Sequence, residues 1–235
     1  MNKRKFWLIG LVIVALVIIG RYYVVEKAPS DFLKEEAMIK EMNNYEKGYN
    51  VQHVKAIIPV DERHYVVPYT TIDNVEAMAF WEWRYAKWNL IQLSTEPILR
   101  WQLDPKDYRS SYIVWNRSAE EVIPYTTALY AQREFRISWG EPFYSPQLLV
   151  KEEIQLGEYG IWAIPKEWQV LMHEKEKSAY VNRDFFNFTN EVSSYKIVAA
   201  YLDESSNSSN LGSRIIGKSN SVIDFLFTTD LDKLQ

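Results

Sequence analysis

The sequence predicts an α+β protein: an N-terminal single transmembrane helix followed by a β-rich, mainly antiparallel sheet or sandwich domain with one or two helices. Three observations predict this class. An uncharged apolar run fills residues 6–20. From Val51 onward, short β-branched and aromatic runs alternate with turn residues, a spacing typical of antiparallel hairpins. Helix signals occur at 30–45 and 165–175.

The first 25 residues predict a membrane anchor. Three basic residues at 3–5 precede the 15 uncharged residues from Phe6 to Gly20. Counting on to Val25 gives a helix of about 30 Å, the thickness of a bilayer's hydrocarbon core, at a rise of about 1.5 Å per residue. The residues assigned to the anchor mark its ends and interfaces: Phe6, Trp7, Gly20, Arg21, Tyr22, Tyr23 and Val25.

The flanking residues predict the orientation of this anchor. Trp7 at one end and Tyr22 and Tyr23 at the other suit the two membrane interfaces, and Arg21 can extend to the headgroups. The basic cluster at 3–5 stays in the cytoplasm by the positive-inside rule, which makes the rest of this single-pass cell-membrane protein extracytoplasmic. A cleaved signal peptide is the alternative. The bulky, charged residues after Gly20 lack a small-residue cleavage site and favour a retained anchor.

The chain is expected to divide into a cytoplasmic tail (1–5), the transmembrane anchor (6–25), a stalk or first helix (26–50) and an extracytoplasmic β-rich domain (51–235). Within the third segment, Ser30 or Asp31 can cap a helix that runs to residue 45.

The strand candidates are β-branched or aromatic runs bounded by turn residues. They are Val51–Val60, His64–Thr71, Met78–Tyr85, Asn89–Ser94, Ile98–Leu103, Tyr112–Asn116, Arg133–Trp139, Leu148–Leu156, Ile161–Ile164, Tyr195–Leu202 and Val222–Phe227. Turns are expected at 61–63, 86–88 and 104–107. A helix with proline at its first position is expected at Pro165–Lys175, and a long Ser/Asn-rich loop at 203–221.

One internal similarity stands out. Val-Val-Pro-Tyr-Thr-Thr at 66–71 recurs as Val-Ile-Pro-Tyr-Thr-Thr at 122–127, and Trp83 and Trp139 keep the same offset. Duplication of one β unit and chance similarity between strand-like segments both explain it, so it marks no domain boundary.

Composition excludes several classes of protein. The chain has no cysteine, which excludes disulfides, thiol nucleophiles and thiolate metal sites. The first 25 residues hold four of the 27 basic residues and none of the 31 acidic ones, so the remainder carries 23 basic and 31 acidic residues, a charge of −8. That balance argues against nucleic acid as a partner and against tight docking on an anionic membrane face.

Tryptophans are the first binding candidates. Strand alternation puts Trp81, Trp83 and Tyr85 on one face, as a possible aromatic platform for sugar rings. Leu99, Trp101 and Leu103 align likewise, as do Phe135, Ile137 and Trp139. A packed core explains the same pattern, with the charged residues between them on a solvated face, and is favoured.

The remaining candidate residues form no complete metal, cofactor or catalytic motif. The histidines (His53, His64 and His173) lack metal-ligand spacing, and no cofactor motif occurs, so we expect no metal or cofactor. Ser193-Ser194-Tyr195-Lys196 matches Ser-x-x-Lys without its partner motifs. The acidic pairs Glu35-Glu36, Glu120-Glu121 and Glu152-Glu153 are expected at solvated edges.

The sequence favours a membrane-anchored module that acts by binding or assembly at the cell envelope rather than by catalysis. Its expected partners are the lipid bilayer, through residues 6–25, and an envelope protein or glycan. The alternative is an envelope polysaccharide or peptidoglycan hydrolase with carboxylates such as Glu82 or Glu141 in a cleft. A structural protein held in a complex through its anchor shares every feature with the first hypothesis.

Overall fold

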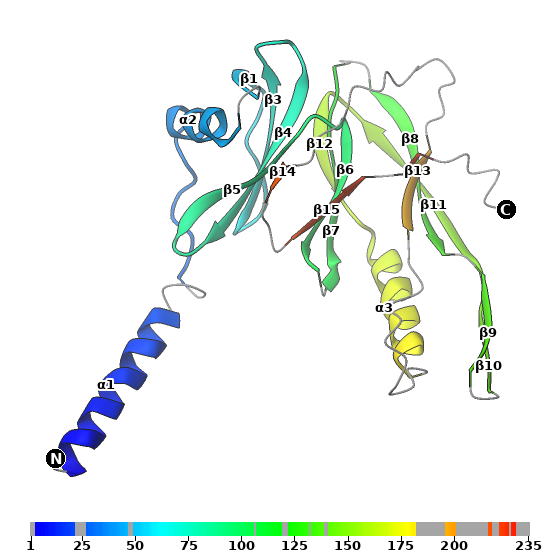
Figure 1. Ribbon diagram of the computed structural model, residues 1–235. Coiled ribbons are helices and arrows are strands. Elements are labelled where there is room, and N and C mark those ends of the chain that lie inside the picture. The colour runs from blue at the N-terminus through cyan, green and yellow to red at the C-terminus, as the bar shows by residue number, and fades with distance from the viewer. Residues whose placement is uncertain are drawn as a thin grey trace. The chain divides into compact units, whose positions relative to one another are not determined.

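The structure is a computed structural model that describes residues 3–21, 27–46, 49–105, 107–118, 122–131, 133–138, 141–181, 196–200, 216–217, 221–225 and 227–228. The chain forms two compact units, residues 1–94 with 215–218 and residues 95–214 with 219–235. The residues predicted as one β-rich domain are therefore shared between two units. The protein is β-rich with antiparallel sheets and a few helices, as predicted (Figure 1).

Helix α1 (Lys3–Arg21) coincides with the apolar run. Its predicted anchor residues Phe6, Trp7, Gly20 and Arg21 are helical, whereas Tyr22, Tyr23 and Val25 lie outside the described residues. Within the part of the chain that the structure describes, no helix is both long enough and apolar enough to cross a membrane. The transmembrane span at 6–25 stays a prediction.

The first unit is built on a six-stranded antiparallel sheet, in which β3, β4 and β5 form a meander (Figure 1). The strand order is β1-β3-β4-β5-β14, and β2 pairs with the first residues of β3. The bounds are β1 Val51–Val54, β2 Ile58–Asp61, β3 His64–Thr71, β4 Glu76–Arg84, β5 Lys87–Ser94 and β14 Ile216–Gly217.

Helix α2 (Glu35–Tyr45) ends where predicted but begins later than Ser30. Its N-cap position is Lys34, which makes no side-chain capping hydrogen bond. The predicted capping role of Ser30 or Asp31 is therefore wrong, because residues 27–34 form no helix and α2 begins only at Glu35. Two side chains attach α2: Tyr45 Oη donates to the Ile91 carbonyl at 3.0 Å, and Asn43 Oδ1 accepts from the Val51 amide at 2.8 Å.

The strand predicted at Val51–Val60 is interrupted, because β1 and β2 flank a gap at residues 55–57. The gap lies opposite Val67 and Pro68 of β3, where proline has no amide hydrogen to donate. The Lys55 amide still donates to the Pro68 carbonyl at 3.0 Å. A proline is therefore tolerated within β3, because strand pairing on one side of β3 is interrupted beside it.

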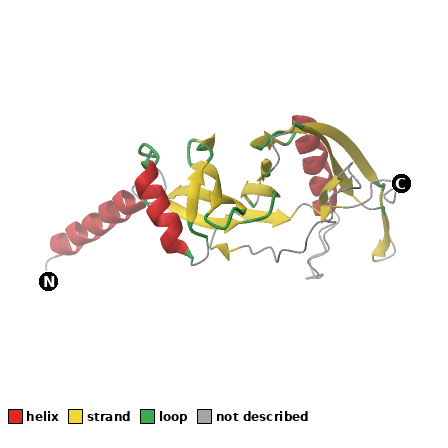
Figure 2. Ribbon diagram, turned by 90° about the horizontal axis from the view of Figure 1, so that it is seen from above, coloured by secondary structure: helices red, strands yellow, loops and turns green. Residues whose placement is uncertain are grey.

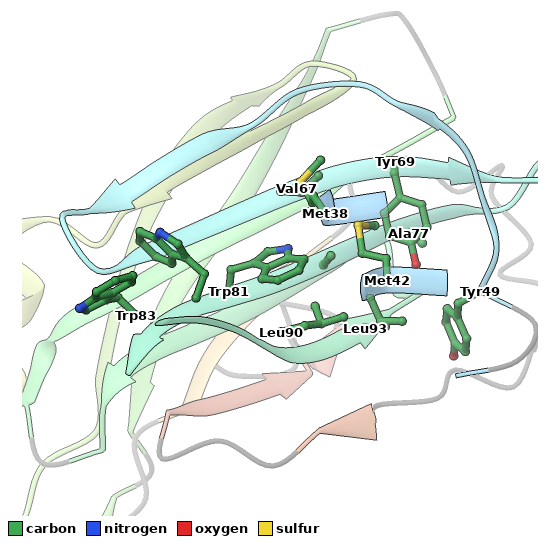
Figure 3. Close-up of a cluster of buried hydrophobic side chains, with 12 residues drawn as sticks. Met38, Met42, Tyr49, Val67, Tyr69, Ala77, Trp81, Trp83, Leu90 and Leu93 are labelled. Carbon is green, nitrogen blue, oxygen red and sulfur yellow. The ribbon is translucent and has the colours of Figure 1, made fainter. Parts of the chain in front are cut away.

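The core of the first unit lies between α2 and one face of the sheet (Figure 3). Met38 and Met42 extend from α2 over Val67 and Tyr69 of β3. The remaining buried members come from the strands and the turn after α2: Tyr49, Ala77, Ala79, Trp81, Trp83, Trp88, Leu90 and Leu93. Large rings and flexible methionines fill the space without a disulfide.

The second unit contains two four-stranded sheets, of orders β12-β7-β6-β15 and β11-β8-β13-β16, and the separate hairpin β9–β10. Among the described strand pairs of this unit, only β13 with β16 is parallel. The bounds are β6 Ile98–Asp104, β7 Asp107–Asn116, β8 Ile123–Ala131, β9 Glu134–Ser138, β10 Glu141–Ser145, β11 Leu148–Leu156, β12 Tyr159–Ala163, β13 Lys196–Ala200, β15 Val222–Phe225 and β16 Phe227–Thr228. Its helix is α3 (Lys166–Val181), which begins directly after Pro165, and α1 and α2 are the helices of the first unit (Figure 2).

Both sheets and α3 contribute to the core of the second unit. Ile113 and Trp115 come from β7, Tyr125 from β8, and Trp168 and Met172 from α3. Gly160 of β12 is needed for this packing, because a Cβ there would lie 2.3 Å from Cζ2 of the Trp115 ring. A glycine is used where strand backbone approaches a buried indole.

The two similar segments occupy comparable places in their units. Tyr69 on β3 and Tyr125 on β8 are both buried in the core of their unit. Pro124 pairs with Gln155 of β11, and the described residues of β13 pair with residues 126–130. Trp139 lies outside the described residues, and duplication stays a prediction.

Candidate functional site

Residues 27–34, which form neither helix nor strand, contact the first sheet and are here called the strap. Its backbone carbonyls accept hydrogen bonds from indoles: Trp83 Nε1 donates to Lys27 O at 3.1 Å. Trp88 Nε1 donates to Ser30 O at 3.2 Å and to Asp31 O at 3.1 Å. These bonds connect residues 56 to 58 positions apart in the sequence and hold the strap on the sheet.

Phe32 of the strap packs into a cluster of rings. Its centroid lies 4.3 Å from that of Tyr65 in a stacked arrangement. It meets Trp88 and Trp81 edge-on at 5.1 and 5.7 Å. Trp83 also belongs to the cluster, with its ring centroid 5.3 Å from that of Trp88. Such pairs contribute about 0.5–1.5 kcal/mol each beyond their buried area.

The three residues of the predicted aromatic platform do not lie together at a surface. Trp81 is fully buried and Trp83 is 5% exposed, on the same face of β4 as the core. Tyr85 is 53% exposed and lies in the turn after β4. Trp81 and Trp83 are therefore core residues, as the favoured interpretation of the alternation pattern predicted. The alternation pattern did not identify Phe32 and Trp88, whose position depends on contacts distant in sequence.

The β4–β5 turn has an unusual composition. Tyr85 and Ala86 are its two central residues, and both have a φ of 56°. Two-residue hairpin turns with positive φ at both positions ordinarily use Asn or Gly, because a Cβ is strained there. The predicted turn at 86–88 thus lies one residue too late. Asn89 Nδ2 braces the turn by donating to the carbonyls of Arg84 at 2.7 Å and Lys87 at 2.9 Å.

Charges surround this turn. Arg84 and Lys87 are directly opposite each other in the strand register, where like charges repel. The Arg84 guanidinium carbon lies 4.6 Å from the centroid of the Tyr85 ring. We call residues 84–87 the β4–β5 tip. It combines an exposed ring with two cations.

The neighbouring β2–β3 turn lies beside this tip. The Trp83 amide donates to the Arg63 carbonyl at 2.7 Å, and Arg63 Nη2 donates to Lys27 O at 3.4 Å. His64 Nδ1 lies 2.8 Å from Asp61 Oδ1. Burial by itself would raise the pKa of Asp61, but the hydrogen bond and charge of His64 and two backbone amides outweigh it and hold the pKa below its usual value.

The other candidate residues lie apart. His53 and His173 are exposed, and no group of three or more metal-ligating side chains gathers among the described residues. Glu152 and Glu153 are exposed on the edge strand β11, as expected of a solvated pair. Glu120, Glu121 and Ser193 lie outside the described residues.

The carboxylates of the hydrolase alternative are in different units: Glu82 is on β4 of the first and Glu141 on β10 of the second. Glu82 pairs with His64 across β3–β4, and its Oε2 is buried without a hydrogen-bond partner among the described residues.

In the second unit, Phe135 was expected on a core face but is exposed. It is 64% exposed on β9 and lies opposite the exposed Tyr144 of β10. The hairpin forms a two-stranded sheet of its own, so alternation there does not indicate a buried face. Trp101 and Leu99 of β6 are fully buried, as predicted for core residues.

Comparison of this chain with known protein families, curated proteins and solved structures finds no match.

Proposed function

We propose that the protein is a single-pass membrane-anchored module whose β-rich units act outside the cytoplasm by binding or assembly at the cell envelope. One observation carries the proposal: α1 exposes consecutive apolar side chains. Leu11, Val12, Ile13, Val14 and Leu16 are each between 55% and 68% exposed. Successive helical residues point about 100° apart, so these side chains cover every side of the helix and not one stripe.

The free energy of these exposed side chains favours an apolar environment. Moving a fully exposed Val, Leu or Ile side chain out of water is worth about 1.5–3 kcal/mol, so these five partly exposed side chains supply about 5–9 kcal/mol. A helix of the 20 residues from Phe6 to Val25, with Arg21 near one end, would span about 30 Å, the thickness of a bilayer core. The basic residues 3–5 place the N-terminus in the cytoplasm.

Binding rather than catalysis is supported by exposed aromatic side chains on two hairpins. Phe135 and Tyr144 form an exposed cross-strand pair on β9–β10, and Tyr85 is exposed on the β4–β5 tip. Aromatic rings are enriched where proteins meet partners. An envelope protein or a glycan is the partner that suits such a surface.

Membrane fractionation of the full chain tests the anchor. The protein should remain in the membrane pellet after washing with alkaline carbonate, and external protease should remove the C-terminal units. The double variant Val12→Arg/Val14→Arg should be extracted, because each arginine at a helix centre costs about 2.5–3.5 kcal/mol on insertion scales. The double variant Val12→Leu/Val14→Leu is the matched control. Extraction of the native chain, or retention of the arginine variant, would contradict the anchor.

Crosslinking of intact membranes, followed by affinity purification of the full chain, tests the binding role. A specific protein or glycan should be recovered, and Phe135→Ala/Tyr144→Ala should reduce its recovery if the hairpin is the contact. Recovery of glycan without a protein would contradict assembly as the role. Release of soluble fragments from purified cell-wall polysaccharide, abolished by Glu82→Gln, would support the hydrolase alternative.

A further inference from the structure

The connection between the predicted anchor and the sheet is short enough to position one end of the first unit. The anchor is proposed to end at Val25, and Lys27 is already hydrogen-bonded to Trp83 and Arg63. Two residues of fully extended chain span at most about 7 Å. If residues 6–25 cross a membrane, the end of the sheet that holds Lys27 must therefore lie at its surface.

The end in question is the one that carries the β4–β5 tip. Trp83 is adjacent to Arg84, and Arg63 belongs to the β2–β3 turn beside it. The opposite end of the same strands is the β3–β4 turn, with exposed Ile72 and Asp73. The eight residues of β3 separate the two ends by about 26 Å at a rise of about 3.3 Å per residue.

The residues of the β4–β5 tip reduce the stability of the folded hairpin. Two residues with a Cβ occupy left-handed positions, and two cations oppose each other across the hairpin. Backbone strain of this kind is a basis for a functional hypothesis. An anionic group between Arg84 and Lys87 would relieve their repulsion, and an interface between water and hydrocarbon suits an exposed tyrosine.

We propose that the β4–β5 tip docks on the membrane that holds residues 6–25, with Tyr85 in the headgroup layer and Arg84 and Lys87 on lipid phosphates. This inference rests on the proposed anchor. The contact is local, because two acidic residues are near it, Asp61 at the end of β2 and Glu62 in the adjacent turn, and the exported chain is acidic overall. Arginine binds phosphate through paired N–H donors, and lysine as a point charge. Docking holds the sheet upright on the membrane and leaves the β3–β4 turn in water.

The absence of cysteine from the chain allows clean site-specific labelling. Two single-cysteine variants of the full chain, Glu62→Cys near the tip and Asp73→Cys at the far turn, carry an environment-sensitive fluorophore. They are reconstituted in vesicles of phosphatidylethanolamine and phosphatidylglycerol with a headgroup-quencher lipid. The Glu62→Cys label should shift to shorter wavelength and be quenched, whereas the Asp73→Cys label should show neither change.

A second set of substitutions separates docking by the side chains of the β4–β5 tip from mere closeness of the label to the membrane. In the Glu62→Cys background, Tyr85→Ser with Arg84→Gln and Lys87→Gln should lose most of the quenching, and Tyr85→Phe with both cations retained should keep it. Equal signals at the two labels, or quenching unchanged by the triple substitution, would overturn the docking proposal. Carbonate extraction of the same vesicles identifies failure of the anchor itself, since the protein then leaves the membrane altogether.

Discussion

Replacing Phe32 by alanine tests whether the strap is part of the folded core. The ring is half-buried and lies within 4.3 to 5.7 Å, centroid to centroid, of Tyr65, Trp88 and Trp81. Truncating a fully buried phenylalanine costs about 3–5 kcal/mol. Half-burial reduces the expected decrease in unfolding free energy to about 2 kcal/mol, a value that already includes the lost ring contacts. Phe32→Leu keeps apolar volume and should cost about 1 kcal/mol.

Urea unfolding of the full chain in detergent, followed by tryptophan fluorescence, measures this loss. With a urea dependence of about 1–3 kcal/mol per molar, the midpoint should fall by about 0.7–2 M. Phe135→Ala is the matched control, because the same atoms are removed from an exposed ring, and its effect should stay within about 0.5 kcal/mol. If Phe32→Ala shifts the midpoint no further than Phe135→Ala, the strap is not part of the core and the argument that places the β4–β5 tip at the membrane fails.

Three further substitutions test local features by the same urea assay. Ala86→Gly should raise the unfolding free energy by about 0.5–1 kcal/mol, because glycine adopts its positive φ without strain; a loss of stability would contradict the turn geometry. Gly160→Ala should cost about 1–3 kcal/mol, since the new methyl group meets the Trp115 ring, and an unchanged midpoint would refute that contact. Asp61→Asn should lower stability near neutral pH, because the lowered folded-state pKa makes the Asp61 carboxylate stabilising above its unfolded value of about 3.9. The difference from the native chain should vanish as pH falls through the folded pKa, and a difference that persists in acid would show that His64 does not stabilise the charged form.

Local sequence patterns predicted several elements to the residue. The bounds of β3 and β11 match their predicted strands, since β-branched and aromatic runs end at turn residues there. The end of α2 at Tyr45 was also predicted. In each case the information lies within a few residues, so a single segment is sufficient to place the element.

Predictions failed where distant residues compete with local preference. Ser30 and Asp31 have the side chains of helix caps, yet their carbonyls accept from Trp88, so the helix begins later. Tyr85 continues the alternation of Trp81 and Trp83, but the chain turns at that residue instead of remaining a strand. Phe135 has a core-like pattern on a hairpin that no further strand covers among the described residues.

The sequence alone determined that this protein is β-rich, that its strands pair mainly antiparallel and that it has no disulfides. It also determined the long apolar run at the N-terminus and the acidic charge of the remainder. Hydrophobic periodicity, turn residues and composition are local quantities, and they are sufficient for those conclusions. Only the tertiary structure decided that Trp83 and Trp88 bind the strap, that Tyr85 alone of the aromatic trio is exposed, and that Arg84 and Lys87 meet at one tip. Those contacts join residues up to 58 positions apart, and their pairing depends on the register of the sheet, which no single segment specifies.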